Sequence, residues 1–243
     1  AEERVPAVSV GRAPPEERVW LGAQARLQVA PQRQALIGRG RAEFEGRRVL
    51  FVLPVATPGG GANIVISEGL AMRSMGVDVE LYNLPENRAG FENAYPGMRI
   101  PVHYGAPEDL AACAGGYDAV VATFNTSVQW LAPLSGGTAI RAYYVQGFEP
   151  YVYESGTLQY QTALESYTLY SDLVRFTKTD WTRRQVLGAT GGDCWVVGPS
   201  FELDLFRPRP VGRSPSSSGP VRIAAMVRPF SVYRAPRLTM GLL

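Results

Sequence analysis

The chain has 243 residues, of which 46% are hydrophobic and 19% charged, so it is long enough for one large domain or two small ones. Its formal net charge of +2 gives no indication of nucleic-acid binding, and the sequence contains no apolar run of membrane length and no signal peptide. Cys113 and Cys194 match no metal-binding or redox spacing. We expect two buried free thiols in a reducing compartment and no metal ion.

Residues 1–46 are predicted to form an N-terminal arm. This part is rich in Arg, Glu, Ala and Pro, and the run Arg-Ala-Pro-Pro at 12–15 breaks any early helix. The pattern around Val19 to Leu36 allows a short amphipathic helix. We expect the arm either to pack on the domain that follows or to be partly disordered.

From Arg47 onward, apolar β-branched runs alternate with helical patterns. The predicted buried strands are Val49–Val55, Val77–Tyr82, Ala119–Phe124, Ala139–Val145, Leu173–Thr177 and Cys194–Val197. The predicted helices are Asn63–Met75, Pro107–Ala114, Thr126–Leu134, Thr157–Tyr170 and Asp180–Leu187. Continuous apolar strands separated by helices predict a Rossmann-like α/β fold, with a parallel sheet covered by helices on both faces. Gly76 is a predicted helix C-cap and Thr179 a predicted N-cap.

A glycine-rich turn after the first strand carries the strongest functional signal. Gly59, Gly60 and Gly61 open directly into a helical pattern, and backbone N–H groups at a helix N-terminus can bind a phosphate. A dinucleotide fingerprint would need glycine where Ile64 stands, and a P-loop would need lysine, whereas the only lysine is Lys178. The alternative is a tight turn that needs positive φ angles.

A second group of polar side chains follows the predicted strand 139–145. Gln146, Glu149, Tyr151 and Tyr153 come just after its carboxyl end, where open α/β sheets bind ligands. Carboxylates, amides and aromatic rings suit sugars, so we predict an acceptor or cleft-facing loop with Glu149 as its main hydroxyl contact. An unpaired buried carboxylate is costly, so Glu149 is expected to be partly open to the cleft or bound by an arginine. The alternative is a structural loop covering the sheet edge.

Three further polar residues have a weaker signal. Asn125 and Thr126 follow the strand 119–124, where they could contact ligand, although capping of the next helix is the simpler interpretation. His103 is the only histidine, and we interpret it as a surface or satisfied residue and only as a weak candidate for a general base.

The C-terminal part is predicted to begin a second domain. A first domain is assigned to 47–207, and residues 208–220, rich in Pro, Ser and Gly, are typical of an interdomain linker. A strand at 221–227 and a helix from Ala235 follow, too little sequence to bury a core. We therefore expect residues 221–243 to be the start of a truncated domain, whose strand does not extend the first sheet.

Four stretches in order resemble one enzyme family. They are residues 59–64 with the helix end at 71–79, 144–153 (YVQGFEPYVY), 179–182 (TDWT) and 201–208 (FELDLFRP). Together they resemble the N-terminal half of a GT-B glycosyltransferase of the retaining nucleotide-sugar family, and the second is similar to bacterial rhamnosyltransferases of surface-glycan assembly.

The resemblance implies a cytoplasmic enzyme that transfers a sugar from a nucleotide-diphosphate donor, such as dTDP-rhamnose, to a glycan or lipid-linked glycan acceptor, with peripheral membrane association. It implies that Gly59–Gly61 face the donor diphosphate together with Arg228 and Arg234, without a metal. The chain as given ends before any pair of glutamates like that of the family's second domain, so the isolated chain is expected to be inactive. The alternatives are a non-catalytic glycan- or partner-binding module and a flavodoxin-like or nucleotide-binding regulator. The regulator fits the alternation of strands and helices but not the linker at 206–208.

Overall fold

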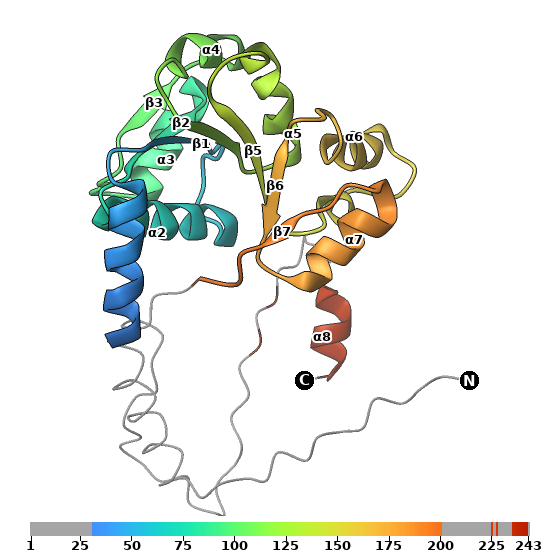
Figure 1. The fold of residues 1–243 in the computed structure, drawn as a ribbon. Coiled ribbons are helices and arrows are strands. Elements are labelled where there is room, and N and C mark those ends of the chain that lie inside the picture. Colours follow the sequence, from blue (N-terminus) through green and yellow to red (C-terminus); the bar gives the residue numbers. More distant parts are fainter. Residues whose placement is uncertain (1–30, 201–224, 226, 228–234, 243) are drawn as a thin grey trace, which may run out of the picture.

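The computed structural model describes residues 31–200, 225, 227 and 235–242, and its centre is a seven-stranded, fully parallel sheet (Figure 1). The strand order is β3-β2-β1-β4-β5-β6-β7. The strands are β1 (Arg48–Val52), β2 (Asp78–Asn83), β3 (Val102–Tyr104), β4 (Ala119–Ala122), β5 (Ile140–Val145), β6 (Val174–Thr177) and β7 (Trp195–Val196). The predicted Rossmann-like α/β fold is confirmed.

Helices cover both faces of this sheet, as predicted. The α-helices after the segment at 31–44 are α2 (Gly60–Ser74), α3 (Arg88–Ala94), α4 (Leu110–Cys113), α5 (Asn125–Val128), α6 (Leu158–Ser166), α7 (Asp180–Thr190) and α8 (Pro236–Leu242). Short 3-10 helices are η1 (Pro85–Asn87), η2 (Pro107–Asp109), η3 (Gln129–Leu134) and η4 (Glu149–Val152). One core packs under α2 and α3, with Val65 and Phe91, and the other under α4 to α7, with Leu110 and Tyr167.

The strand order reverses between β1 and β4. Val49 of β1 is paired with Val79 on one side and with Ala119 on the other. The chain leaves the carboxyl ends of these two strands toward opposite faces, since α2 packs on one core and α5 on the other. Such a switch point is where open α/β sheets bind ligands, and the loops after β1 and β4 border it.

The predicted helix caps are confirmed. Gly76, at φ +86°, follows the end of α2, a left-handed conformation that favours glycine. The Thr179 hydroxyl accepts a hydrogen bond of 3.1 Å from the Thr182 N–H at the start of α7, which satisfies one of the free donors of that helix.

Several boundaries differ from the predictions. Helix α2 begins at Gly60 rather than Asn63, so two of the glycines lie in its first turn. The elements β3 and α3 were not predicted, because β3 has three residues and α3 buries only Phe91. Strand β7 is not buried: Trp195 is 76% exposed and Val196 44%, because β7 is the edge strand and has a neighbour on one side only.

The N-terminal helix also lies later than predicted. The described segment is helical at 31–44, past Leu36, and it contacts α2 where the Arg41 guanidinium donates to the Ser74 carbonyl at 2.7 Å. Residues 19–30 of the predicted helix, the linker at 208–220 and most of the predicted strand at 221–227 lie outside the described residues. Helix α8 agrees with the helix predicted from Ala235.

The packing of α3 on the loop after β1 can be tested with a glycine pair. A Cβ added at Gly90 would lie 2.7 Å from the backbone oxygen of Ala56, whereas one at Gly188 in α7 would meet nothing within 4 Å. We expect Gly90→Ala to lower the free energy of unfolding by about 1–3 kcal/mol. Gly188→Ala should raise it by about 0.5–1 kcal/mol. Urea denaturation measures both, and stabilisation by both substitutions would contradict this packing.

Candidate functional site

The N-terminus of α2 is open to a ligand. Its N-cap, Gly59, is extended at φ −156°, no side chain caps the helix, and the first turn contains no acidic residue. The first N–H groups of a helix have no partner within the helix and carry its positive dipole end. The turn after β1 therefore presents free donors at the carboxyl edge of the sheet, beside the switch point.

The glycines of this turn are not explained by backbone strain. None of Gly59, Gly60 and Gly61 is among the glycines with positive φ, so the interpretation as a tight turn needing positive φ is wrong. A Cβ added at Gly59 or Gly60 would meet nothing within 4 Å. Neither the backbone nor the packing of the described residues therefore requires glycine at these two positions.

Gly61 is different, because it brings the two predicted groups of site residues together. A Cβ at Gly61 would lie 3.0 Å from Oε1 and 3.2 Å from Nε2 of Gln146, so the Gln146 amide after β5 packs against the first turn of α2. The Gln146 Oε1 atom is buried and has no hydrogen-bond partner within the described part of the chain. Buried polar atoms are normally satisfied, so this acceptor is available to a donor group.

A neighbouring buried amine was missed by the sequence analysis. Lys178 follows β6, and its Nζ atom is buried without a hydrogen-bond partner among the described residues. It lies 4.0 Å from the Glu68 carboxylate and 5.4 Å from the centre of the Tyr144 ring. Burial lowers the pKa of Lys178, and the Glu68 charge partly opposes this. The available signal was a lone lysine directly after a buried strand.

Glu149 is placed differently from the prediction. It is only 5% exposed, so it is not open to a cleft, and no arginine of the described residues binds it. Instead, its Oε2 atom accepts hydrogen bonds from the backbone N–H of Asn125 at 2.6 Å and from the Asn125 side-chain amide at 2.8 Å. The cost of burying a carboxylate is offset here by amide donors from the next loop.

The surroundings of Glu149 are apolar and aromatic. Burial raises the pKa of Glu149 to about 7, although the hydrogen bonds from Asn125 oppose the shift. Burial and the nearby Glu149 charge both raise the pKa of Tyr143 and Tyr167. The Tyr167 hydroxyl accepts a hydrogen bond of 2.9 Å from the Glu149 N–H. Glu149 therefore binds the 3-10 turn η4 to the core and to α5.

The other residues predicted for the acceptor site differ in exposure. Asn125 is buried as the first residue of α5 and is not its N-cap, whereas Thr126 is exposed. Tyr151 is 52% exposed, and its hydroxyl donates to Oε1 of Gln185 at 3.1 Å. Tyr153 lies inward, with its hydroxyl 3.3 Å from the Asn125 side-chain nitrogen. Arg228 and Arg234 lie outside the described residues.

His103 belongs to a separate charged cluster. Its Nε2 atom contacts the Glu80 carboxylate, which also accepts a 2.8 Å hydrogen bond from the Tyr117 hydroxyl. The Arg48 guanidinium lies over the Tyr117 ring at 4.4 Å. Arg48 is the first residue of β1, whereas Glu80 and His103 lie further along β2 and β3. His103 is thus a satisfied residue, as the simpler interpretation predicted.

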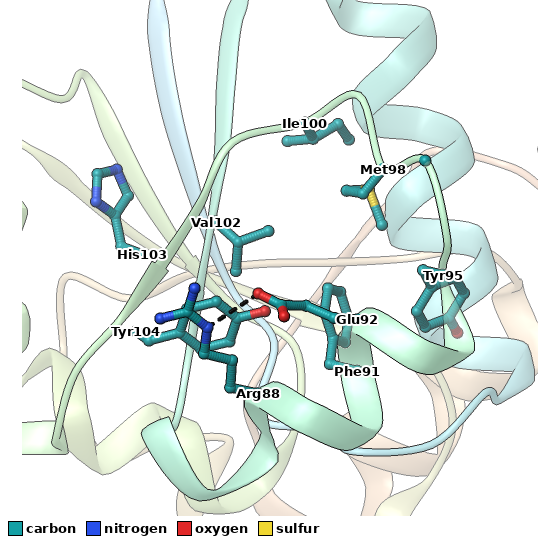
Figure 2. A pocket seen from close by; sticks show the side chains of 10 residues that line it. Arg88, Phe91, Glu92, Tyr95, Met98, Ile100, Val102, His103 and Tyr104 are labelled. Carbon is teal, nitrogen blue, oxygen red and sulfur yellow. Dashed lines mark hydrogen bonds and ion pairs between the residues drawn. The ribbon is translucent and has the colours of Figure 1, made fainter.

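An open cavity of about 610 Å³ lies beyond the edge strand β3 (Figure 2). Its lining residues are Arg88, Phe91, Glu92, Tyr95, Gly97, Met98, Ile100, Val102, His103 and Tyr104. The Arg88 and Glu92 side chains form an ion pair of 3.0 Å across its wall. None of the residues predicted for the donor or acceptor site lines this cavity.

Comparisons with known proteins establish no family. No family model matches the chain, and no curated protein matches it. Among solved structures, a Lactobacillus casei protein from the Northeast Structural Genomics Consortium is 11% identical with a TM-score of 0.38, over 55% of this chain and 74% of that one. This similarity is too weak to support a fold assignment, which is therefore based on the strand order of the sheet. Within the described part of the chain, no helix is long and apolar enough to cross a bilayer.

Glu149 should make stability depend on pH. Its pKa in the folded protein is about 7, above the ordinary value of 4.5, so the folded protein keeps a proton that the unfolded chain releases. Stability should therefore fall as the pH rises from about 4.5 to 7, by up to about 3 kcal/mol.

In Glu149→Gln this pH dependence should be lost, because a side-chain amide does not titrate in this range. The protein should still fold, because the amide oxygen can accept both bonds from Asn125. Glu149→Ala should be strongly destabilised at either pH, since the Asn125 donors lose their partner. Urea denaturation at about pH 5 and 8 measures both effects. An equal pH dependence in wild type and Glu149→Gln would contradict the raised pKa. Any contribution of His103 cancels in this comparison, because both proteins contain it.

Proposed function

We propose that the chain is the N-terminal, acceptor-side half of a bacterial GT-B glycosyltransferase. The complete enzyme would transfer a sugar, for which L-rhamnose from dTDP-rhamnose is our first candidate, to a glycan or lipid-linked glycan. It would work in the cytoplasm, at the inner face of the membrane. The proposal is based on the four sequence stretches that resemble this family and on the geometry of the turn after β1.

The observation that carries the proposal is that Gly59 and Gly60 are not needed by the fold. They have open space around them and no unusual backbone conformation, but they begin α2 beside the switch point of the sheet. A ligand that approaches the backbone closely would explain glycine there. The free N–H groups and the dipole at this helix end favour an anion such as a diphosphate.

In the proposed reaction, this helix end stabilises the leaving group. As the bond between the anomeric carbon and the diphosphate oxygen breaks, negative charge develops on the diphosphate. Fixed backbone N–H donors at the first turn of α2 would stabilise that charge without reorganising. Arg228 and Arg234 are proposed to add positive charge from the second domain, on the strength of the family resemblance. Gln146, packed on Gly61, would help to fix the position of the turn.

Because Glu149 is buried and not open to a cleft, we assign it a different role from the one predicted from the sequence. A carboxylate that is 5% exposed and bound to Asn125 is a poor direct contact for an acceptor hydroxyl. We propose that Glu149 positions the loop from Gln146 to Tyr153 instead. The acceptor would then contact exposed groups of the same edge, among which are Thr126 and Tyr151.

Sugar transfer by the protein from the complete reading frame, with a panel of nucleotide-diphosphate sugars, tests the proposal. We expect the Gly60→Val side chain to keep the diphosphate away from the backbone N–H. This should lower kcat/KM by about 10²-fold, the cost of losing one well-placed oxyanion donor, with an unchanged melting temperature. Gly188→Val, also at a site with open space, is the matched control and should retain activity. An unaffected Gly60→Val enzyme would assign the turn a structural role only.

The same experiment separates the enzyme from a non-catalytic module. The 243-residue chain alone is expected to transfer no sugar, and transfer by it would contradict the division of roles between the two halves. If the complete protein binds a glycan but transfers no sugar from any donor of the panel, the glycan-binding module becomes the better interpretation.

A further inference from the structure

Two large aromatic side chains lie half-exposed and adjacent at the carboxyl edge of the sheet. Tyr151 on η4 is 52% exposed and Trp181 in the first turn of α7 is 50% exposed. Their ring centres are 6.4 Å apart and the planes are tilted by 52°. The two rings therefore form a shallow apolar corner between the loops that follow β5 and β6.

This corner is held rigidly by the interior. The Tyr151 ring meets Phe148 edge to face at 4.8 Å, and Phe148 stacks near the Tyr167 ring at 6.1 Å. Tyr167 in turn stacks on Tyr143 at 5.6 Å. Phe148, Tyr167 and Tyr143 are buried, so a continuous column of rings runs from the core to the surface.

Polar contacts fix the corner from outside. The Tyr151 hydroxyl donates to Gln185 on α7 at 3.1 Å, which joins η4 to α7. The start of α7 is fixed by the Thr179 cap. The Tyr151 ring and the start of α7 are thus fixed before a ligand binds, and such preorganisation favours affinity.

The charges near the corner are balanced. Arg184 pairs with Asp180 at 3.3 Å, and Arg183 pairs with Asp193 at 2.6 Å. An anionic bilayer or a polyanion would be attracted by an excess of positive charge, which these pairs do not provide. Paired carboxylates and a nearby amide suit hydroxyl groups, and aromatic faces suit the C–H faces of a pyranose ring. The chemistry favours a neutral sugar.

We propose that the exposed rings of Tyr151 and Trp181 form a platform that binds a neutral saccharide of the acceptor by stacking. This inference rests on the proposed function and deepens it, because it assigns the acceptor to a surface that Trp181 completes. Tyr151 and Glu149 share the same 3-10 turn. The buried carboxylate of Glu149 therefore positions the platform, and the rings make the contact.

Titration of the 243-residue chain with an L-rhamnose trisaccharide and with maltotriose tests this, read from the indole N–H signals in NMR spectra. We expect the Trp181 signal to shift, and Trp181→Ala or Tyr151→Ala to weaken binding about tenfold or more, as for stacked bases. Trp195→Ala removes an indole that is 76% exposed on β7 and should change nothing. Tyr151→Phe keeps the ring but loses the bond to Gln185, so it should weaken binding less than Tyr151→Ala.

Some results would overturn the platform. These are no saccharide binding up to about 10 mM, near the weak end of measurable affinity, or an equal shift of Trp195. Others are a Trp181-dependent response to anionic phosphatidylglycerol vesicles or to dTDP instead of the saccharides. Melting curves show whether each variant is folded. Saccharide binding at Trp181 without sugar transfer would keep the platform and refute the glycosyltransferase, whereas Gly60-dependent transfer with unaltered binding in Trp181→Ala would do the reverse.

Discussion

One buried carboxylate joins the loops at the carboxyl edge of the sheet, where the candidate site lies. Glu149, on the loop after β5, accepts two hydrogen bonds from Asn125, which begins the helix after β4. Its own N–H donates to the hydroxyl of Tyr167 in the core. These bonds tie two adjacent loops and the core to one side chain, so the positions of η4 and of the rings it carries depend on it. Each hydrogen bond contributes little net stability, but leaving a buried donor or acceptor unpaired costs much more. Other positions of this loop, in which these groups would be unpaired, are therefore disfavoured.

The sheet could be predicted from the sequence because its central strands β1 and β4 are almost entirely apolar and β5 is interrupted by one charged residue. Where the physical signal was local, as in the caps at Gly76 and Thr179, the prediction was also accurate. The prediction missed β3, because three residues are too few to show an alternating pattern. It was also wrong about the burial of β7. The apolar run at 194–197 predicts burial, but burial depends on having a neighbour on each side, and the position of a strand in the sheet is a property of the whole chain.

The sequence predicted which loops contribute to the candidate site, but it did not predict which of their side chains contact one another. Gln146 and Gly61 were both named, yet their contact depends on how β1 and β5 are placed across β4. For Glu149, the principle that a buried carboxylate needs a partner was sound, but the partner is an amide 24 residues away and not an arginine. Lys178 was noted only for excluding a P-loop, since its burial depends on α2 crossing the same face.

The lone lysine has a practical consequence. Lys178 is the only ε-amine in the chain, and its nitrogen is buried at the end of β6 between Glu68 and the Tyr144 ring. Reductive methylation of amines can therefore modify only this side chain and the terminal amine. The rate of labelling, followed by mass spectrometry, therefore measures how often this single buried position opens by local unfolding at the carboxyl edge of the sheet.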